Sequence, residues 1–179
     1  MMNKNNDSVS ISFKEQKELL FKDLCARLPY EVVGQCELDA SYDTSFDTIF
    51  QTHKFDAMVY GINTDSLFVY PLIEDRDEEE FANEEVAKGI DILDFKPYLF
   101  PMSSMTDEQC HKFYFGFVEN EIDYNDFKNY YFDGCLWNKI LTSINDCSDI
   151  IDWFNKNHFD YRGLIEKGLA IDATGLNIY

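Results

Sequence analysis

AMVYGINTDSLFVYPLI, residues 57–73, has the clearest strand pattern in the sequence. Two runs rich in β-branched and aromatic residues, Ala57 to Ile62 and Leu67 to Ile73, flank the polar segment Asn63-Thr64-Asp65. Runs of this composition are typical of strands, and the polar segment is typical of a turn. The pattern therefore predicts an antiparallel hairpin.

Shorter runs of the same kind precede this hairpin, at Val32-Val33 and from Phe46 to Phe50. The segments between the runs have the composition of turns: Gly34, Asp39 to Asp43, and His53 to Asp56. We therefore expect a small antiparallel β-meander of three or four strands from about residue 30 to residue 73.

A helix is predicted upstream of the meander. Ser12 and Glu15 have the spacing of a capping box, and leucines follow at intervals of four residues. Pro29 is expected to end this helix, because the residue before a proline is driven toward extended geometry. The first ten residues are polar, and residues 1–11 are predicted to be a disordered tail.

The segment from Glu74 to Glu85 reads EDRDEEEFANEE and contains eight acidic residues and one basic residue. We expect a short exposed helix that continues to Lys88 and is capped by Gly89. Carboxylates at this density repel one another, so the helix would fray.

The second half of the chain is predicted to be largely helical. The segment from Lys96 to Pro101 contains two prolines and is not expected to be a central strand or a helix. Thr106 and Gln109 have capping-box spacing, and apolar residues at helical spacing continue to Phe154. Gly163 and Gly168 are expected to interrupt a last helix.

These elements predict an α+β fold: an N-terminal helix, a small antiparallel meander and a helical C-terminal half packed on one sheet face. Residues 12–179 are predicted to be a single domain, because no Gly, Ser or Pro-rich linker divides the chain.

The charge of the chain limits its partners. Thirty-four acidic residues against 15 Lys and Arg give a net charge of −19. Such a field repels phosphate, so neither direct nucleic-acid binding nor an anionic membrane surface is expected. We expect a protein partner with a basic surface.

The five cysteines are odd in number and form no C-x-x-C pair, and the first ten residues contain no apolar signal segment. We therefore expect reduced thiols in a cytosol, mostly as small core residues.

Four residues near the C-terminus form a candidate catalytic corner. His158, Asp160, Tyr161 and Arg162 bring an imidazole, a carboxylate, a phenol and a guanidinium together. One interpretation is an acid–base or anion-binding site. In the alternative, Asp160 caps a following helix, Arg162 pairs with a nearby acid, and His158 is a cation at the end of the preceding helix.

Glu108 and His111 are a weak metal candidate, because a Glu and a His three residues apart are half of a di-iron carboxylate site. No second such pair occurs in the sequence, so the alternative is a solvated helix face. No cofactor is predicted.

Residues 113–132 contain nine aromatic side chains. Core packing of a helix pair is the first interpretation. The alternative is an exposed patch for a protein partner.

Three segments of the sequence resemble a known group of proteins. They are Lys22 to Tyr30 (KDLCARLPY), Lys96 to Thr106 (KPYLFPMSSMT) and Asn157 to Ala170 (NHFDYRGLIEKGLA). Together they resemble uncharacterised small proteins of gut-bacterial phages and prophages, a group without a known function. The resemblance implies a phage context and the cytoplasm of a bacterial host, and it assigns no catalytic residue.

The leading hypothesis is a non-enzymatic acidic interaction protein that binds a basic host protein, in its sharpest form a nucleic-acid mimic or inhibitor. The partner-binding candidates are the clustered acids Glu74, Asp75, Asp77, Glu78, Glu79, Glu80, Glu84 and Glu85. One alternative is a small hydrolase or metal-dependent enzyme that uses the His158/Asp160 corner. Another is a virion or assembly component, and the oligomeric state stays open.

Overall fold

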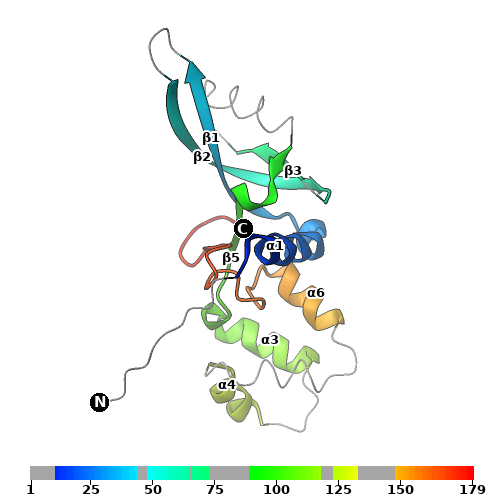
Figure 1. Ribbon diagram of the computed structural model, residues 1–179. Coiled ribbons are helices and arrows are strands. Elements are labelled where there is room, and N and C mark those ends of the chain that lie inside the picture. The colour runs from blue at the N-terminus through cyan, green and yellow to red at the C-terminus, as the bar shows by residue number, and fades with distance from the viewer. Residues whose placement is uncertain (1–10, 44–47, 65, 73–88, 118–122, 133–147) are drawn as a thin grey trace, which may run out of the picture.

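The computed structural model describes residues 11–43, 48–64, 66–72, 89–117, 123–132 and 148–179 (Figure 1). It confirms the predicted α+β class. The elements in chain order are α1 (Phe13–Arg27), η1 (Leu28–Tyr30), β1 (Val33–Asp43), β2 (Thr48–Ile62), β3 (Ser66–Pro71), β4 (Ile90–Asp91), η2 (Ile92–Asp94), β5 (Phe95–Leu99), η3 (Met102–Ser104), α3 (Asp107–Phe117), α4 (Tyr124–Phe132), α6 (Ser148–Lys156) and β6 (Ile171–Asp172).

The start of α1 confirms the predicted capping box. The Ser12 backbone N–H donates to Glu15 Oε2 at 2.9 Å, and the Glu15 N–H donates to Ser12 Oγ at 3.4 Å. These bonds satisfy backbone donors that the first turn of a helix leaves unpaired. The helix ends at Arg27, and Pro29 lies in the short 3₁₀ turn that follows.

In the described part of the chain, the sheet has six strands in the order β4-β3-β2-β1-β5-β6. Every neighbouring pair is antiparallel except β5 and β6, which are parallel. The hairpin predicted from residues 57–73 is present as β2 and β3. In the turn between them, the Ser66 N–H donates to Asn63 Oδ1 at 2.8 Å.

Three predicted turns are wrong. Gly34 and residues 39–43 lie inside β1, and residues 53–56 lie inside β2, because these two strands pair over eleven positions from Val33↔Met58 to Asp43↔Thr48. Turn-type residues are tolerated in this long ribbon. At Gly34 the reason is steric, because an added Cβ would lie 2.8 Å from Cα of Pro97 in the neighbouring strand.

The exclusion of a central strand around Pro97 is also wrong, since β5 lies between β1 and β6. The Val59 N–H donates to Val32 O at 2.9 Å, so alternate residues of β1, including Gly34, direct their backbone groups toward β2. Pro97 lies opposite Gly34 and is therefore not required to donate a hydrogen bond to β1. On its other side, β5 pairs with β6 only at Tyr98 and Leu99.

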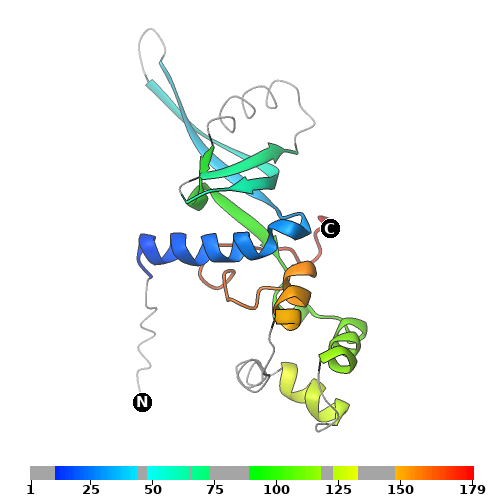
Figure 2. The ribbon, with the colours of Figure 1, turned by 90° about the vertical axis from the view of Figure 1, so that its right-hand side faces the viewer.

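Helix α1 covers one face of the sheet and lies below it in Figure 2. Leu20 and Leu24 of α1 are buried against alternate residues of two strands. Those strand residues are Phe55, Ala57 and Val59 of β2 and Leu67 and Val69 of β3. This packing gives the sheet its apolar core.

A second apolar cluster joins α3, α4 and α6. Phe113 stacks at 6.1 Å on Phe127 and at 5.3 Å on Phe154, measured between ring centroids. The predicted core packing is confirmed for Phe113, Tyr114 and Phe127, whereas Phe115 is exposed. The capping box of α3 is also confirmed, because the Gln109 N–H donates to Thr106 Oγ1 at 3.2 Å.

The predicted last helix is wrong, because residues 157–170 form a series of turns. Gly163 and Gly168 have φ angles of 67° and 69°, and His158 ends α6 with a φ of 56°. These left-handed conformations stop helical propagation.

The helices predicted for residues 74–88 and 136–144 lie outside the described residues. Among the helices that are described, none is long and apolar enough to cross a membrane.

Candidate functional site

The candidate corner near the C-terminus is built on a buried ion pair from α1. Arg27 and Asp23 are both fully buried, and their side chains form two hydrogen bonds, Nε to Oδ2 at 2.7 Å and Nη2 to Oδ1 at 3.2 Å. The guanidinium also donates to the carbonyl oxygen of Phe159 at 2.7 Å and to that of Phe154 at 3.5 Å. Arg27 therefore fastens the end of α6 to α1.

Arg162 and Tyr161 extend this cluster. Arg162 Nε lies 3.2 Å from Asp23 Oδ1, so the predicted pairing of Arg162 with a nearby acid is confirmed. The Tyr161 ring lies near two cations, with its centroid 5.4 Å from Arg27 Cζ and 4.9 Å from Arg162 Cζ. The pKa of Tyr161 is raised, mainly because burial disfavours the charged phenolate.

The Asp160 carboxylate closes a turn. Its two oxygens accept hydrogen bonds from the N–H groups of Leu164 and Ile165, each at 2.8 Å. The expectation that Asp160 caps a helix is wrong in form, since turns follow, although the carboxylate does accept backbone donors.

His158 is buried and stacks on Tyr179, with ring centroids 3.6 Å apart. Burial, and then the nearby charge of Arg27, lower the pKa of His158 to about 4. The imidazole is therefore neutral at pH 7, and the alternative that made it a helix-terminal cation is wrong.

The four predicted residues thus come together in space, and each contacts another part of the chain. The backbone of His158 and Asp160 binds Phe100 on both sides, through Phe100 N–H to His158 O at 2.9 Å and Asp160 N–H to Phe100 O at 2.8 Å. Asp23 and Arg27 belong to the same cluster but were not singled out from the sequence. This arrangement is suited to holding the C-terminal segment against α1 and β5.

The buried neutral imidazole predicts a specific loss of stability in acid. The folded pKa of His158 lies below the unfolded value of 6.5, so the unfolded chain takes up the proton first as pH falls. The contribution of neutral His158 to the free energy of unfolding is complete above about pH 6.5. It is lost as the pH falls from there to about 4, and the loss is at most roughly 3 kcal/mol. We expect the urea midpoint of His158→Asn to fall less over this range than that of the unsubstituted protein.

Asparagine suits this test because it tolerates the positive φ at position 158 and does not titrate. Loss of the ring stack on Tyr179 lowers stability equally at every pH, so only the slope is informative. Equal slopes for the two proteins would contradict the buried neutral state.

Glu108 and His111 are engaged with other groups. Glu108 lies 2.8 Å from the Lys112 ammonium, and this hydrogen bond lowers the pKa of Glu108. The His111 ring packs against Phe115 at 4.4 Å and Tyr124 at 5.3 Å. Within the described ranges, no group of three or more His, Cys, Asp or Glu residues is arranged to hold a metal ion.

The cysteines with described side chains are unsuited to nucleophilic chemistry. Cys36 and Cys110 are buried, and burial raises the pKa of Cys36 to about 12, so its thiol stays protonated. Cys25 is exposed, which differs from the expected core role. Partial desolvation of its thiol nevertheless raises its pKa.

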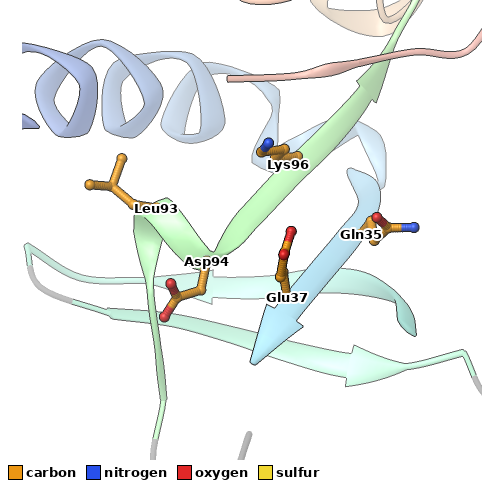
Figure 3. A pocket seen from close by; sticks show the side chains of 5 residues that line it. All are labelled: Gln35, Glu37, Leu93, Asp94 and Lys96. Carbon is orange, nitrogen blue, oxygen red and sulfur yellow. The ribbon is translucent and has the colours of Figure 1, made fainter. Parts of the chain in front are cut away.

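A polar pocket of about 300 Å³ lies where β5 leaves β1 (Figure 3). Its lining residues are Gln35 and Glu37 of β1, Leu93 and Asp94 of η2, and Lys96 of β5. Sequence reasoning missed this pocket, because its two halves are far apart in the chain and carry no motif.

The strands β1 and β2 form an arm that projects beyond the rest of the sheet (Figure 1). Strand β5 pairs with β1 only from Gly34 to Cys36, and β3 pairs with β2 only from Ala57 to Ile62. In the part of the chain that the structure describes, residues 37–43 and 48–56 are therefore a two-stranded ribbon with no strand on either side. We call this ribbon the β-arm.

The β1 strand of the arm is acidic. Acidic residues stand at three of its odd-numbered positions, Glu37, Asp39 and Asp43. Glu37 lies 3.1 Å from Lys54 of β2, and both side chains are about half exposed. The eight acidic candidates from Glu74 to Glu85 lie outside the described residues.

Comparison with known proteins gives no match: no family model, no curated protein and no solved structure is similar to the chain.

Proposed function

We propose that the protein is a non-enzymatic interaction protein that binds a partner with a basic surface. The observation that carries this proposal is the projecting β-arm, whose β1 strand has acidic residues at positions 37, 39 and 43. A projecting ribbon can bind a partner without disturbing the core. The net charge of −19 would steer a basic partner toward it.

The arrangement of the His158 corner supports a binding role over a hydrolase. Asp160 uses both oxygens on backbone donors, and His158 is buried against Tyr179. A general base must reach the proton that it removes. The Asp160 oxygens are already used by backbone donors, and His158 Nδ1 is buried, where a substrate in solution does not reach it.

The proposal has a finer form. Resemblance to phage and prophage proteins suggests action in the cytoplasm of a bacterial host, against a host protein that binds nucleic acid. The carboxylates of residues 74–85 would then occupy phosphate sites on that partner, as a nucleic-acid mimic does. Such binding weakens as salt rises, because surface charges are screened.

A charge-reversal variant tests this finer form. We expect E78K/E79K/E80K to lose binding to the partner while its melting temperature changes little. The reason is that surface charge affects association more than it affects the fold. The measurement is a pull-down of basic nucleic-acid-binding proteins from bacterial lysate at two salt concentrations, read by mass spectrometry.

The matched control is E18K/D152K/E166K, which makes the same change in net charge at exposed positions elsewhere. Loss of the partner in both variants would indicate a general charge effect. Retention in E78K/E79K/E80K would remove residues 74–85 from the binding surface.

A further inference from the structure

The backbone of β1 has one side turned toward β2 and one side turned outward. Because Val59 N–H donates to Val32 O, residue 32 faces β2, and every second residue after it does the same. Residues 33, 35, 37, 39, 41 and 43 therefore direct their N–H and C=O groups outward. Tyr179 supports this assignment, since its hydroxyl lies 3.4 Å from Val33 N and 3.2 Å from Val33 O.

Among the described residues, neighbouring groups cover the outward side of β1 at one end only. The Tyr179 hydroxyl binds Val33 and also donates to Tyr98 O at 2.9 Å, and Gln35 pairs with Lys96 of β5. From residue 37 to residue 43, no described strand lies beside them. A row of such groups is a template for adding another strand.

A second copy of this chain is a poor occupant of this edge. Antiparallel self-pairing about position 40 would place Glu37 of each copy opposite position 43, which is also acidic. Like charges directly opposite one another destabilise a sheet. A strand with cations at the facing positions would instead be stabilised.

The ion pair between Glu37 and Lys54 does not prevent Glu37 from binding a cation of an added strand. This contact is a surface ion pair, worth about 0–1 kcal/mol, in which a cation from another strand can replace Lys54. The pocket beside Glu37 shows that the side chains of η2 and β5 leave space there. An added strand would continue the line of β5 from this pocket along β1.

We propose that the outer edge of the β-arm binds an extended segment of the partner that carries Lys or Arg at alternate positions. The segment adds to β1 as an antiparallel strand, with cations opposite Glu37, Asp39 and Asp43. This proposal rests on the proposed function and names the part of the partner that is recognised. The backbone bonds supply affinity, and the alternate charges supply selectivity.

The first test uses the peptide acetyl-Lys-Val-Thr-Val-Lys-Val-Lys-amide and fluorescence anisotropy. We expect salt-sensitive binding to the full chain, and protection from hydrogen exchange at residues 37, 39, 41 and 43. Ser41→Pro removes one outward N–H and should weaken binding about tenfold, whereas Ser41→Ala keeps that N–H and should bind within about twofold. Equal binding by the two variants would overturn the proposal.

A second test needs no variant. N-methylation of the peptide at its lysines removes the N–H groups that would face β1, and it should abolish binding. N-methylation at its valines alters the opposite edge and should leave binding intact. Equal effects of the two methylations would overturn the proposal even if Ser41→Pro unfolds the arm.

The pull-down separates this proposal from the proposed function. Capture of a basic partner that competes with the peptide supports both. Capture with no peptide binding overturns strand addition and leaves the interaction function in place. Peptide binding with no captured basic protein supports the edge as a binding site and counts against the wider function.

Discussion

Arg27→Met is expected to lower the free energy of unfolding by about 3–5 kcal/mol, the largest effect of any single change considered. The substitution removes the fully buried guanidinium and leaves the buried Asp23 carboxylate, among the described residues, with only the longer contact to Arg162. It also takes the donor away from the carbonyl oxygens of Phe154 and Phe159. Urea unfolding followed by circular dichroism measures the loss.

Two further variants identify the cause. The double substitution D23L/R27M should recover part of the loss, because it removes the uncompensated carboxylate as well. Lys112→Ala breaks the exposed pair with Glu108 and should change stability by less than about 0.5 kcal/mol. An Arg27→Met protein as stable as Lys112→Ala would show that the buried pair contributes little.

Gly34→Ala is expected to destabilise the protein by about 3 kcal/mol, since an added Cβ would overpack the contact between β1 and β5. That Cβ would lie 2.5 Å from Cζ of Phe95 and 2.8 Å from Cα of Pro97. Backbone cannot move aside as a flexible side chain does, so the two strands must separate. Thermal unfolding and loss of exchange protection in β5 both report the change.

Gly116→Ala is the matched control, because a Cβ at this exposed helical position meets nothing within 4 Å. Alanine has a higher helix propensity than glycine, by up to about 1 kcal/mol, so this variant should be slightly more stable. If both alanine variants behaved alike, the close approach of β1 and β5 would not be a constraint.

Local signals predicted the parts of the fold that depend on neighbouring residues. The capping boxes at Ser12 and Thr106 and the turn at Asn63 each need only a few consecutive residues, and all three are present. Strand lengths were underestimated because turn-type residues also fit a long antiparallel ribbon. Pro97 was misjudged because its tolerance depends on which side of the strand faces β1, and only the pairing register gives this.

In the candidate site too, features that depend on neighbouring residues were predicted, and features that depend on distant parts of the chain were not. His158, Asp160, Tyr161 and Arg162 are close in sequence and were found together, but their roles depend on α1. The spacing of Leu20, Asp23, Leu24 and Arg27 places two charges on the buried stripe of α1, and this unusual pattern is the signal that could have revealed the ion pair. The edge of the β-arm could not have been found, because it depends on where β5 stops pairing.

The Arg27 contacts also have a consequence for synthesis on the ribosome. The two carbonyl groups that Arg27 binds lie 127 and 132 residues later in the chain. At about 5–20 residues per second, translation of that interval takes on the order of 10 s. During this time the carbonyl partners of Arg27 have not been synthesised. The apolar face of the nascent α1 is also without its later packing partners. Contacts between residues so far apart in sequence slow folding, and Arg27 can bind both carbonyl groups only after residue 159 has been synthesised.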